Sequence, residues 1–105
     1  MRDRSCIGPR VDVYNVGRIT IGIDALISQD SYICTASHDF RHPDFPLTVA
    51  DVTIEDRAWV CARSMIMPGV TIASGSIIGA GSVASRSTQQ GKVYAGNPIR
   101  LVGTV

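Results

Sequence analysis

The sequence predicts an all-β protein that is built as a coil with three short flat sides per turn. Two observations lead to this prediction. Aliphatic residues recur at every sixth position along most of the chain, and small residues follow most of them four positions later. A period of six fits neither an α-helix nor a plain amphipathic strand, whose periods are 3.6 and 2. Glycine and β-branched residues are frequent, which also disfavours helices.

Length and composition narrow the class of protein. At 105 residues the chain suffices for one domain, and we expect residues 1–105 to form it. With 45% apolar residues, 18% charged residues and a net charge of +1, it is not expected to be disordered or to bind nucleic acid. No apolar run reaches the ~20 residues of a membrane span and no signal-peptide core is present, so we expect a cytoplasmic protein without membrane insertion.

The three cysteines do not form a recognisable framework. They are odd in number and lack CxxC or Cys/His spacing, so we expect buried or half-exposed thiols and no zinc site. They are Cys6, Cys34 and Cys61. A chain this short leaves much of its surface unburied, and oligomerisation is a common remedy.

The first part of the repeat contains one short break. Aliphatic residues lead the hexapeptides at Ile7 and Val13, and the next one, Ile21, follows after eight residues. Two residues are therefore extra within VYNVGRIT. The period then continues regularly through Ile27 to Ile33.

The second break is longer and contains both histidines of the protein. From Ile33 to Ile54 we count one hexapeptide followed by a fifteen-residue segment, Asp39 to Thr53, which should leave the coil and return. Its prolines suit a loop, and its large apolar side chains indicate that the loop packs on something, such as another subunit. The residues concerned are Pro43, Pro46, Phe40, Phe45 and Leu47.

The last part of the repeat is regular. Its leading positions are Ile54, Val60, Ile66, Ile72, Ile78 and finally Ala84. We expect each leading aliphatic to point inward and to stack on its equivalent one turn away, with glycine-rich turns between the sides. A single turn cannot bury its apolar face, so stability should come mainly from neighbouring turns.

This pattern resembles the hexapeptide-repeat family, whose fold is a left-handed parallel β-helix, from Ile7 to about Val102. The handedness comes from the resemblance, since crossovers between parallel strands are usually right-handed. The segments SHDFRHPDFPL, VTIEDRAWVCARSMIMPGVTI, IIGAGSV and VYAGNPIRLV are similar to the sugar and exopolysaccharide O-acetyltransferases of the colanic-acid, galactoside and maltose types. Against that family pattern the chain begins inside the repeat, so we expect it to be N-terminally short.

The resemblance implies an acetyl-CoA-dependent O-acetyltransferase that acts on a sugar or glycan precursor. A hydroxyl is a weak nucleophile at pH 7, and imidazole, with an ordinary pKa of about 6.5, suits the base that such transfer needs. His38 matches the catalytic loop histidine of the family, whereas His42 has no matching role. Asp39 and Asn15 are expected to contact the substrate. For Asp39, orientation of His38 and a purely turn-forming role remain open.

The same resemblance implies a groove for acetyl-CoA and requires no metal. Trp59 would flank the pantetheine or pack on a neighbouring subunit, and Ala62 and Ala80 match positions whose backbone binds the pantetheine amides. The remaining positions are Ser85 and Arg86, which match a Thr-Lys pair, and Arg100, which matches an arginine near the adenine and 3′-phosphate. A surface role remains open for both arginines. The family assembles as a homotrimer with active sites between subunits.

Two other functions are open to proteins with such a coil. A truncated, catalytically inactive hexapeptide-repeat protein could serve as a trimeric structural or CoA-binding module. A carbonic anhydrase of the same fold needs three zinc histidines, and this chain has two histidines, both in one segment. The first rival stays open and the second is excluded.

Overall fold

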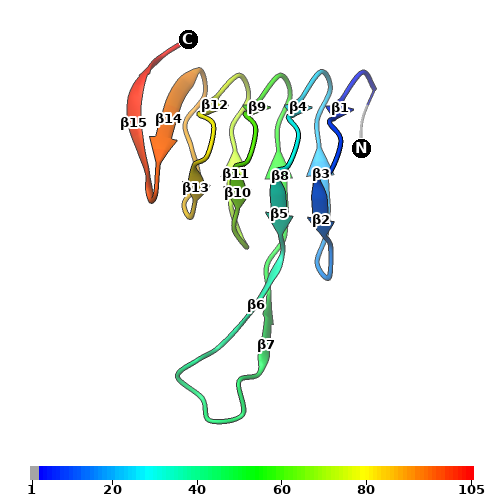
Figure 1. The fold of residues 1–105 in the computed structure, drawn as a ribbon, viewed down its shortest axis with the longest axis vertical. Helices are drawn as coiled ribbons and strands as arrows, with labels where there is room; N and C mark the ends of the chain where they lie inside the picture. Colours follow the sequence, from blue (N-terminus) through cyan, green and yellow to red (C-terminus); the bar gives the residue numbers. More distant parts are fainter. Residues whose placement is uncertain (1–2) are drawn as a thin grey trace.

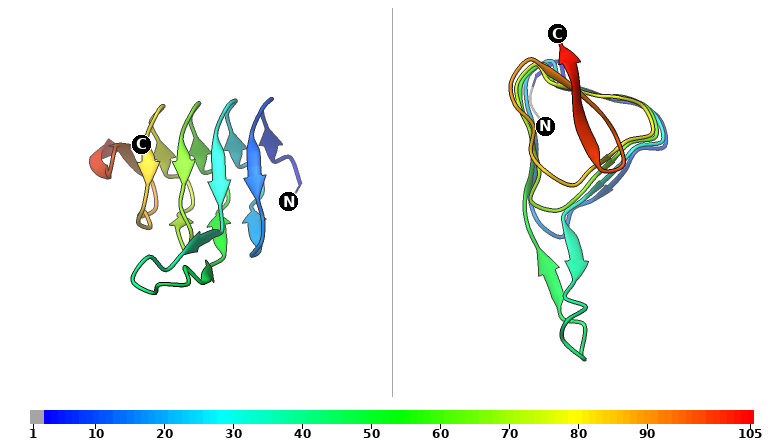
Figure 2. Two further views of the ribbon diagram at one scale, coloured as in Figure 1. Left: turned by 60° about the horizontal axis from the view of Figure 1, so that its bottom comes forward. Right: turned by 90° about the vertical axis from the view of Figure 1, so that its left-hand side faces the viewer.

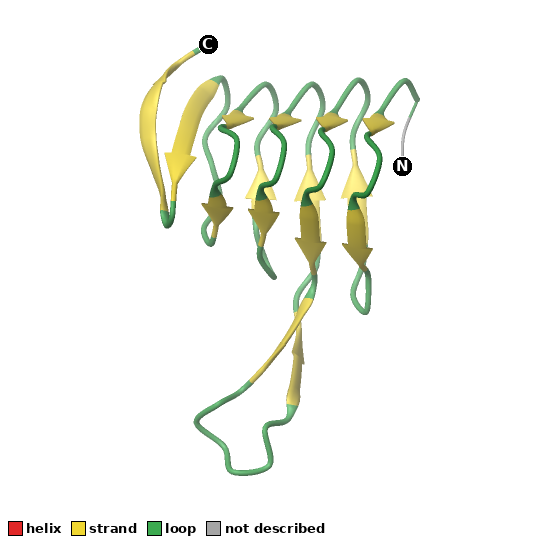
Figure 3. Ribbon diagram, viewed as in Figure 1, coloured by secondary structure: helices red, strands yellow, loops and turns green. Residues whose placement is uncertain are grey.

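The computed structural model describes residues 3–105, which wind into a triangular prism of stacked coils with one hairpin projecting from it (Figures 1 and 2). The predicted left-handed parallel β-helix is confirmed. Within the described residues all regular structure is strand (Figure 3). In that part of the chain, no helix could therefore cross a membrane.

The prism has three faces, and each face is a sheet of stacked strands that pair in parallel, apart from the last strand of the first face. The first face contains, in spatial order, β1 (Cys6–Ile7), β4 (Leu26–Ile27), β9 (Trp59–Val60), β12 (Ile77–Ile78), β14 (Lys92–Gly96) and β15 (Ile99–Thr104). The second face contains β13 (Val83–Ala84), β10 (Met65–Ile66), β5 (Tyr32–Cys34) and β2 (Asp12–Tyr14). The third face contains β11 (Thr71–Ile72), β8 (Val52–Ile54) and β3 (Ile19–Ile21). The last strand, β15, pairs antiparallel with β14.

Turns at three corners of the prism connect the faces. The first corner joins the first face to the second, through residues 8–11, 28–31, 61–64 and 79–82. The second corner joins the second face to the third, through residues 15–18, 35–51, 67–70 and 85–88. The third corner returns the chain to the first face, through residues 22–25, 55–58 and 73–76.

The strand registers confirm how many extra residues each break contains. Leu26 pairs with Cys6, 20 residues earlier, which is two more than a regular turn of eighteen. Trp59 pairs with Leu26, 33 residues earlier, which is fifteen more. Ile77 pairs with Trp59 after 18 residues, the regular spacing. Both insertions lie at the second corner.

The larger insertion leaves the coil three residues earlier than the predicted segment 39–53. Strands β6 (Ala36–His38) and β7 (Leu47–Val49) form an antiparallel hairpin, and the Ala50 N–H closes its base on the Thr35 carbonyl at 2.9 Å. Val52 is already fully buried in the coil. The period of six gives the correct number of inserted residues but does not show where the two chain segments meet. The hydrogen bond between Ala50 and Thr35 sets this boundary.

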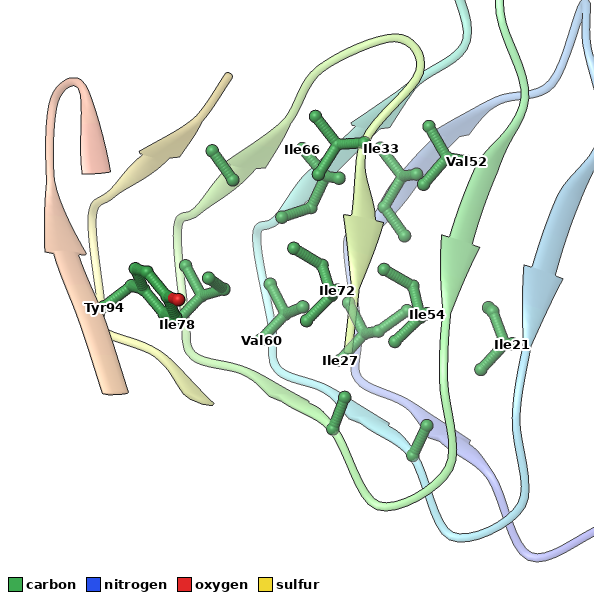
Figure 4. Packing of buried hydrophobic residues seen from close by; sticks show 14 of the residues in the cluster. Ile21, Ile27, Ile33, Val52, Ile54, Val60, Ile66, Ile72, Ile78 and Tyr94 are labelled. Atoms are coloured by element: carbon green, nitrogen blue, oxygen red, sulfur yellow. The ribbon is translucent and has the colours of Figure 1, made fainter. Parts of the chain in front are cut away.

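The leading aliphatic positions form the core. Figure 4 shows the isoleucines and valines of successive turns stacked inside the prism, and Ile27, Ile54 and Ile72 are completely buried. Burying each such side chain stabilises the fold by roughly 1.5–3 kcal/mol. Tyr94 and Ile99, on the β14–β15 hairpin, cover the C-terminal end of this core.

Serines occupy many of the small positions, and in the described part of the chain every buried serine hydroxyl has a hydrogen-bond partner. The buried Ser31 hydroxyl donates to the Cys61 carbonyl at 3.1 Å, and the buried Ser64 hydroxyl donates to the Gly79 carbonyl at 3.1 Å. Each hydroxyl thus ties one turn to the next, so a small polar residue at the corner adds cohesion along the axis.

Candidate functional site

His38 lies on β6, outside the coil, and is exposed. Its Nδ1 atom is 2.8 Å from the carbonyl oxygen of Phe45, across the hairpin. A carbonyl can only accept a hydrogen bond, so Nδ1 carries the proton in the neutral ring and Nε2 keeps its lone pair. The hairpin therefore fixes the tautomer in which Nε2 can accept a proton.

The residues that follow His38 build the tip of the hairpin. The Asp39 carboxylate accepts the Arg41 N–H at 3.0 Å, and the Asp39 N–H donates to the Pro46 carbonyl at 2.9 Å. Within the described residues the carboxylate makes no hydrogen bond to His38, so the geometry favours the turn-forming reading of Asp39. His42 accepts the Asp44 N–H on its Nδ1 at 3.2 Å and stays within the tip.

Asn15 lies at the same corner as the hairpin, in the exposed turn after β2. Thr35 connects this turn to the hairpin base: its hydroxyl donates to the Tyr14 carbonyl at 2.8 Å and accepts the Gly17 N–H at 2.8 Å. The structure thus places Asn15, His38 and the tip at the second corner. Sequence reasoning missed Thr35 and Phe45, because a backbone carbonyl and a buried threonine leave no motif.

Ala62 and Ala80 lie at the first corner, stacked one turn apart. The Gly81 N–H donates to the Ala62 carbonyl at 2.9 Å, which holds the two turns in register. The N–H groups of Ala62 and Ala80 themselves find no hydrogen-bond partner between residues 3 and 105. Two backbone donors therefore remain available at this corner.

Two of the three predicted C-terminal residues approach the same corner. Arg100 faces Ala95 in the β14–β15 pair, and Ala95 lies against Gly79 at the start of the last first-corner turn. The Arg86 guanidinium donates to the Ile99 carbonyl, next to Arg100, at 3.4 Å. Ser85 is exposed at the second corner and does not join them.

Trp59 lies on the outer side of the first face and is 41% exposed. Its indole N–H donates to the Ser28 hydroxyl at 2.9 Å, which fixes the ring against the preceding turn. In the strand ladder it is flanked by Leu26 and Ile77, so the outer side of this face carries an apolar stripe. The ring is therefore held by a hydrogen bond while part of its surface stays exposed to solvent.

The predicted residues thus form two groups in one chain. The acceptor-side group, with His38, lies on the hairpin at the second corner, and the donor-side group, with Ala62 and Ala80, lies at the first corner. The width of the second face separates the two corners, roughly 10–20 Å at about 3.3 Å per residue. A single chain does not bring the groups together.

The three cysteines are free thiols that differ in exposure. Burial raises the pKa of the Cys61 thiol, beside Ala62, so it is neutral at pH 7. Cys34 is buried, as expected, and Cys6 is exposed, more than the sequence predicted. Cys6 lies on β1, the outermost strand of the first face, where no further strand covers it within the described residues.

A shallow hollow of about 250 Å³ on the third face contains none of the predicted site residues. Its carboxylates serve the coil: Asp56 accepts the Ile23 N–H at 2.8 Å, and Glu55 accepts the Ser74 N–H at 3.0 Å. These contacts join neighbouring turns, and the hollow follows from the small residues between them.

Ion pairs lie at the first and third corners near the N-terminal end of the coil. Arg4 pairs with Asp24 at 2.8 Å and Arg10 pairs with Asp30 at 2.6 Å. Hydrogen bonds from these guanidinium groups lower the pKa of both carboxyls. Because the pairs are exposed, they contribute little to stability.

Comparison with known proteins finds a similarity to one family of transferases. The model of the bacterial transferase hexapeptide, which consists of six repeats, matches residues 51–85. Residues 51–85 and the coil of hexapeptides are thus similar to the hexapeptide-repeat transferases.

Individual relatives and solved structures are similar to this chain over almost its whole length. A protein of Escherichia coli K12 that is named as a colanic acid biosynthesis acetyltransferase, WcaF, is 38% identical over 100 residues, which cover 95% of this chain and 55% of the relative. Among solved structures, a maltose O-acetyltransferase from Clostridium difficile matches with a TM-score of 0.82 and 27% identity, over 97% of this chain and 59% of that one. The N-acyltransferase AntD from Bacillus cereus, solved with dTDP-4-amino-4,6-dideoxyglucose and coenzyme A, matches with a TM-score of 0.85 and 26% identity, over 95% of this chain and 60% of that one. The chain spans about half the length of the curated relatives it matches.

Proposed function

We propose that this chain carries out acetyl transfer from acetyl-CoA to a hydroxyl of a sugar or glycan precursor, with His38 as the general base. The observation that carries the proposal is the hydrogen bond from Nδ1 of His38 to the Phe45 carbonyl, which in the neutral ring leaves the lone pair on Nε2 of this exposed side chain. The names of the similar proteins, a colanic acid acetyltransferase and a maltose O-acetyltransferase, support a sugar acceptor.

The proposed reaction is a direct transfer. Nε2 of His38 takes the hydroxyl proton while the oxygen forms a bond to the acetyl carbon, and the carbon–sulfur bond then breaks. The departing thiolate takes this proton from the imidazolium and leaves as the CoA thiol, so no acyl-enzyme is needed. Asp39, in the tip of the hairpin, and Asn15, at the same corner of the coil, would contact the sugar.

The donor would lie along the first corner. The unpaired N–H groups of Ala62 and Ala80 suit the carbonyls of pantetheine, and Trp59 would flank its chain. The arginines would approach the phosphates, because a guanidinium suits phosphate geometry. Arg86 and Arg100 would serve the nucleotide end together with Ser85. Coenzyme A in the similar AntD structure supports this choice of donor.

We further propose a homotrimer in the cytoplasm, where acetyl-CoA is available. The separation of the two groups of site residues supports shared sites, because the hairpin of one subunit can approach the first corner of another. The exposed apolar side chains of the hairpin support the same arrangement: Phe40 is 76% exposed and Phe45 is 56% exposed. Free apolar surface of this kind is typical of subunit interfaces.

The proposal is tested by measuring the release of free CoA thiol from acetyl-CoA in the presence of a panel of sugars and amino sugars. We expect turnover with a hydroxyl acceptor and a loss of about 10²–10⁴-fold in kcat for His38→Ala. His42→Ala, on the same hairpin, is the matched control and should retain activity. Full activity of His38→Ala would contradict the assigned base. Binding of CoA without turnover on any acceptor would favour the inactive CoA-binding module instead.

A further inference from the structure

Thr35 is a fully buried polar residue at the base of the hairpin, directly before β6. Its hydroxyl donates to the Tyr14 carbonyl at 2.8 Å and accepts the Gly17 N–H at 2.8 Å. Its backbone N–H also donates to the Tyr14 carbonyl, at 3.1 Å, and its carbonyl accepts the Ala50 N–H at 2.9 Å. One residue thus joins the start of the hairpin to the turn of residues 15–18.

The other end of the hairpin is joined to the same turn. The Asp51 carboxylate accepts the Arg18 N–H at 2.9 Å, and the Arg18 carbonyl accepts the Val52 N–H at 3.0 Å. Both insertions of the coil lie at this corner, and Figure 1 shows the turn after β2 beside the base of the hairpin. The short insertion therefore supplies the backbone groups that hold the long one.

Gly17 allows the hairpin to lie directly against this turn. A Cβ at this position would lie 2.8 Å from Cγ1 of Val49, on β7, and 3.2 Å from Cβ of Thr35. Atoms this close would overlap, so a side chain here would push the hairpin away from the turn. The contact is thus tight as well as hydrogen-bonded.

These contacts connect two residues that the proposed function assigns to the acceptor side. Asn15 directly follows Tyr14, whose carbonyl accepts two hydrogen bonds from Thr35. His38 ends β6, the strand that begins directly after Thr35. Because a buried, fully bonded hydroxyl makes its surroundings rigid, the position of His38 relative to Asn15 depends on Thr35.

We propose that Thr35 is a positioning residue, which fixes the His38 hairpin relative to the Asn15 turn so that both side chains address the same acceptor sugar. The inference rests on the proposed function, because it takes His38 as the base and Asn15 as an acceptor contact. Proton transfer requires the base within hydrogen-bond reach of the hydroxyl, and a displacement of about 1 Å can cost roughly 100-fold in rate. Thr35 acts through these two side chains and needs no contact with either substrate.

The test is steady-state kinetics of acetyl transfer, with the hydroxyl acceptor that the sugar panel identifies and with release of free CoA thiol as the signal. Thr35→Val keeps the shape of the side chain but removes both hydroxyl bonds, and we expect kcat to fall roughly 10- to 100-fold. The KM for acetyl-CoA should stay near that of the unaltered protein, because the proposed donor strip lies at the first corner. Thr35→Ser keeps the hydroxyl and should recover most of the loss.

Thr88→Val is the matched control. Thr88 is also a buried threonine, and its hydroxyl accepts the Ala73 N–H at 2.8 Å and bonds the Ser76 hydroxyl at 2.9 Å. These bonds hold the third corner and do not reach the hairpin. Thr88→Val should lower the midpoint of urea denaturation about as much as Thr35→Val does, while kcat stays near that of the unaltered protein.

Gly17→Ala is a second variant, which leaves the Thr35 hydroxyl in place and displaces the hairpin through Val49. It should also lower kcat, and it decides the question if Thr35→Val does not fold. An undiminished kcat in the folded variant, or an equal loss of kcat in Thr88→Val, would overturn the inference alone. Absence of turnover by the unaltered protein on every acceptor would overturn the proposed function and the inference with it.

Discussion

Side-chain size matters most for residues at the corners, where two turns of backbone pass close to each other. Gly22, at the third corner, is buried and donates its N–H to the Ile54 carbonyl at 2.7 Å. A Cβ at this position would lie 2.6 Å from the backbone nitrogen of Asp56 and 2.8 Å from the carbonyl carbon of Glu55. These backbone atoms are fixed by the ladder and cannot move aside without breaking it.

We therefore expect Gly22→Ala to lower the free energy of unfolding by about 1–3 kcal/mol through overpacking. Gly103→Ala is the control, because a Cβ there meets nothing within 4 Å. Urea denaturation followed by circular dichroism measures both. Equal stability of the two variants would show that the third corner yields to an added methyl group.

The β6–β7 hairpin is an insertion that the coil does not need for its own register. Its base is closed by the Ala50 N–H on the Thr35 carbonyl, so the two flanking residues already lie side by side. Its tip is held by its own contacts, including the His38 bond to Phe45. The element is therefore attached to the coil without interrupting the stack of isoleucines.

Excision of residues 36–50, with Thr35 joined to Asp51, should leave a folded coil. Ile54 would then follow Ile33 by six residues, the spacing of the regular repeat. Turn-to-turn packing supplies most of the stability of a solenoid, so we expect cooperative thermal unfolding to be retained. Acetyl transfer should be lost with His38. The full-length His38→Ala variant is the comparison, and an unfolded excision variant would show that the hairpin helps to build the coil.

The molecule as a whole places its two groups of site residues at different corners, so the proposed enzyme requires an assembly. Light scattering should give three times the chain mass of 11.2 kDa. A closed ring of three subunits would place each hairpin against the next subunit's first corner. The apolar stripe with Trp59 and the exposed hairpin side chains offer the surfaces for such contacts.

Mixed trimers test whether the sites are shared. His38→Ala removes the base, and Ala80→Trp places a bulky side chain on the donor strip; each variant alone should be inactive. When the two are unfolded and refolded together in equal amounts, about a quarter of the interfaces pair an intact hairpin with an intact strip, and a similar share of the activity should return. Mixtures that stay inactive, while a wild-type control refolds with activity, would place each site within one subunit.

The sequence was sufficient to predict the coil and the size of both insertions, because each turn is a local repeat that stacks on an almost identical neighbour. Ile27, Ile54 and Ile72 could be assigned to the core from spacing alone. His38 and the donor-side alanines came from motifs, and their roles remain predictions.

Contacts between segments that are distant in the sequence could be established only from the tertiary structure. The hairpin boundary depends on Thr35 meeting Ala50, and the tautomer of His38 depends on the Phe45 carbonyl. The separation of the two site groups likewise depends on which corner each insertion occupies. A local period specifies what repeats along the chain, whereas the hydrogen-bond partners of the backbone and of the inserted hairpin are decided only when the turns are stacked.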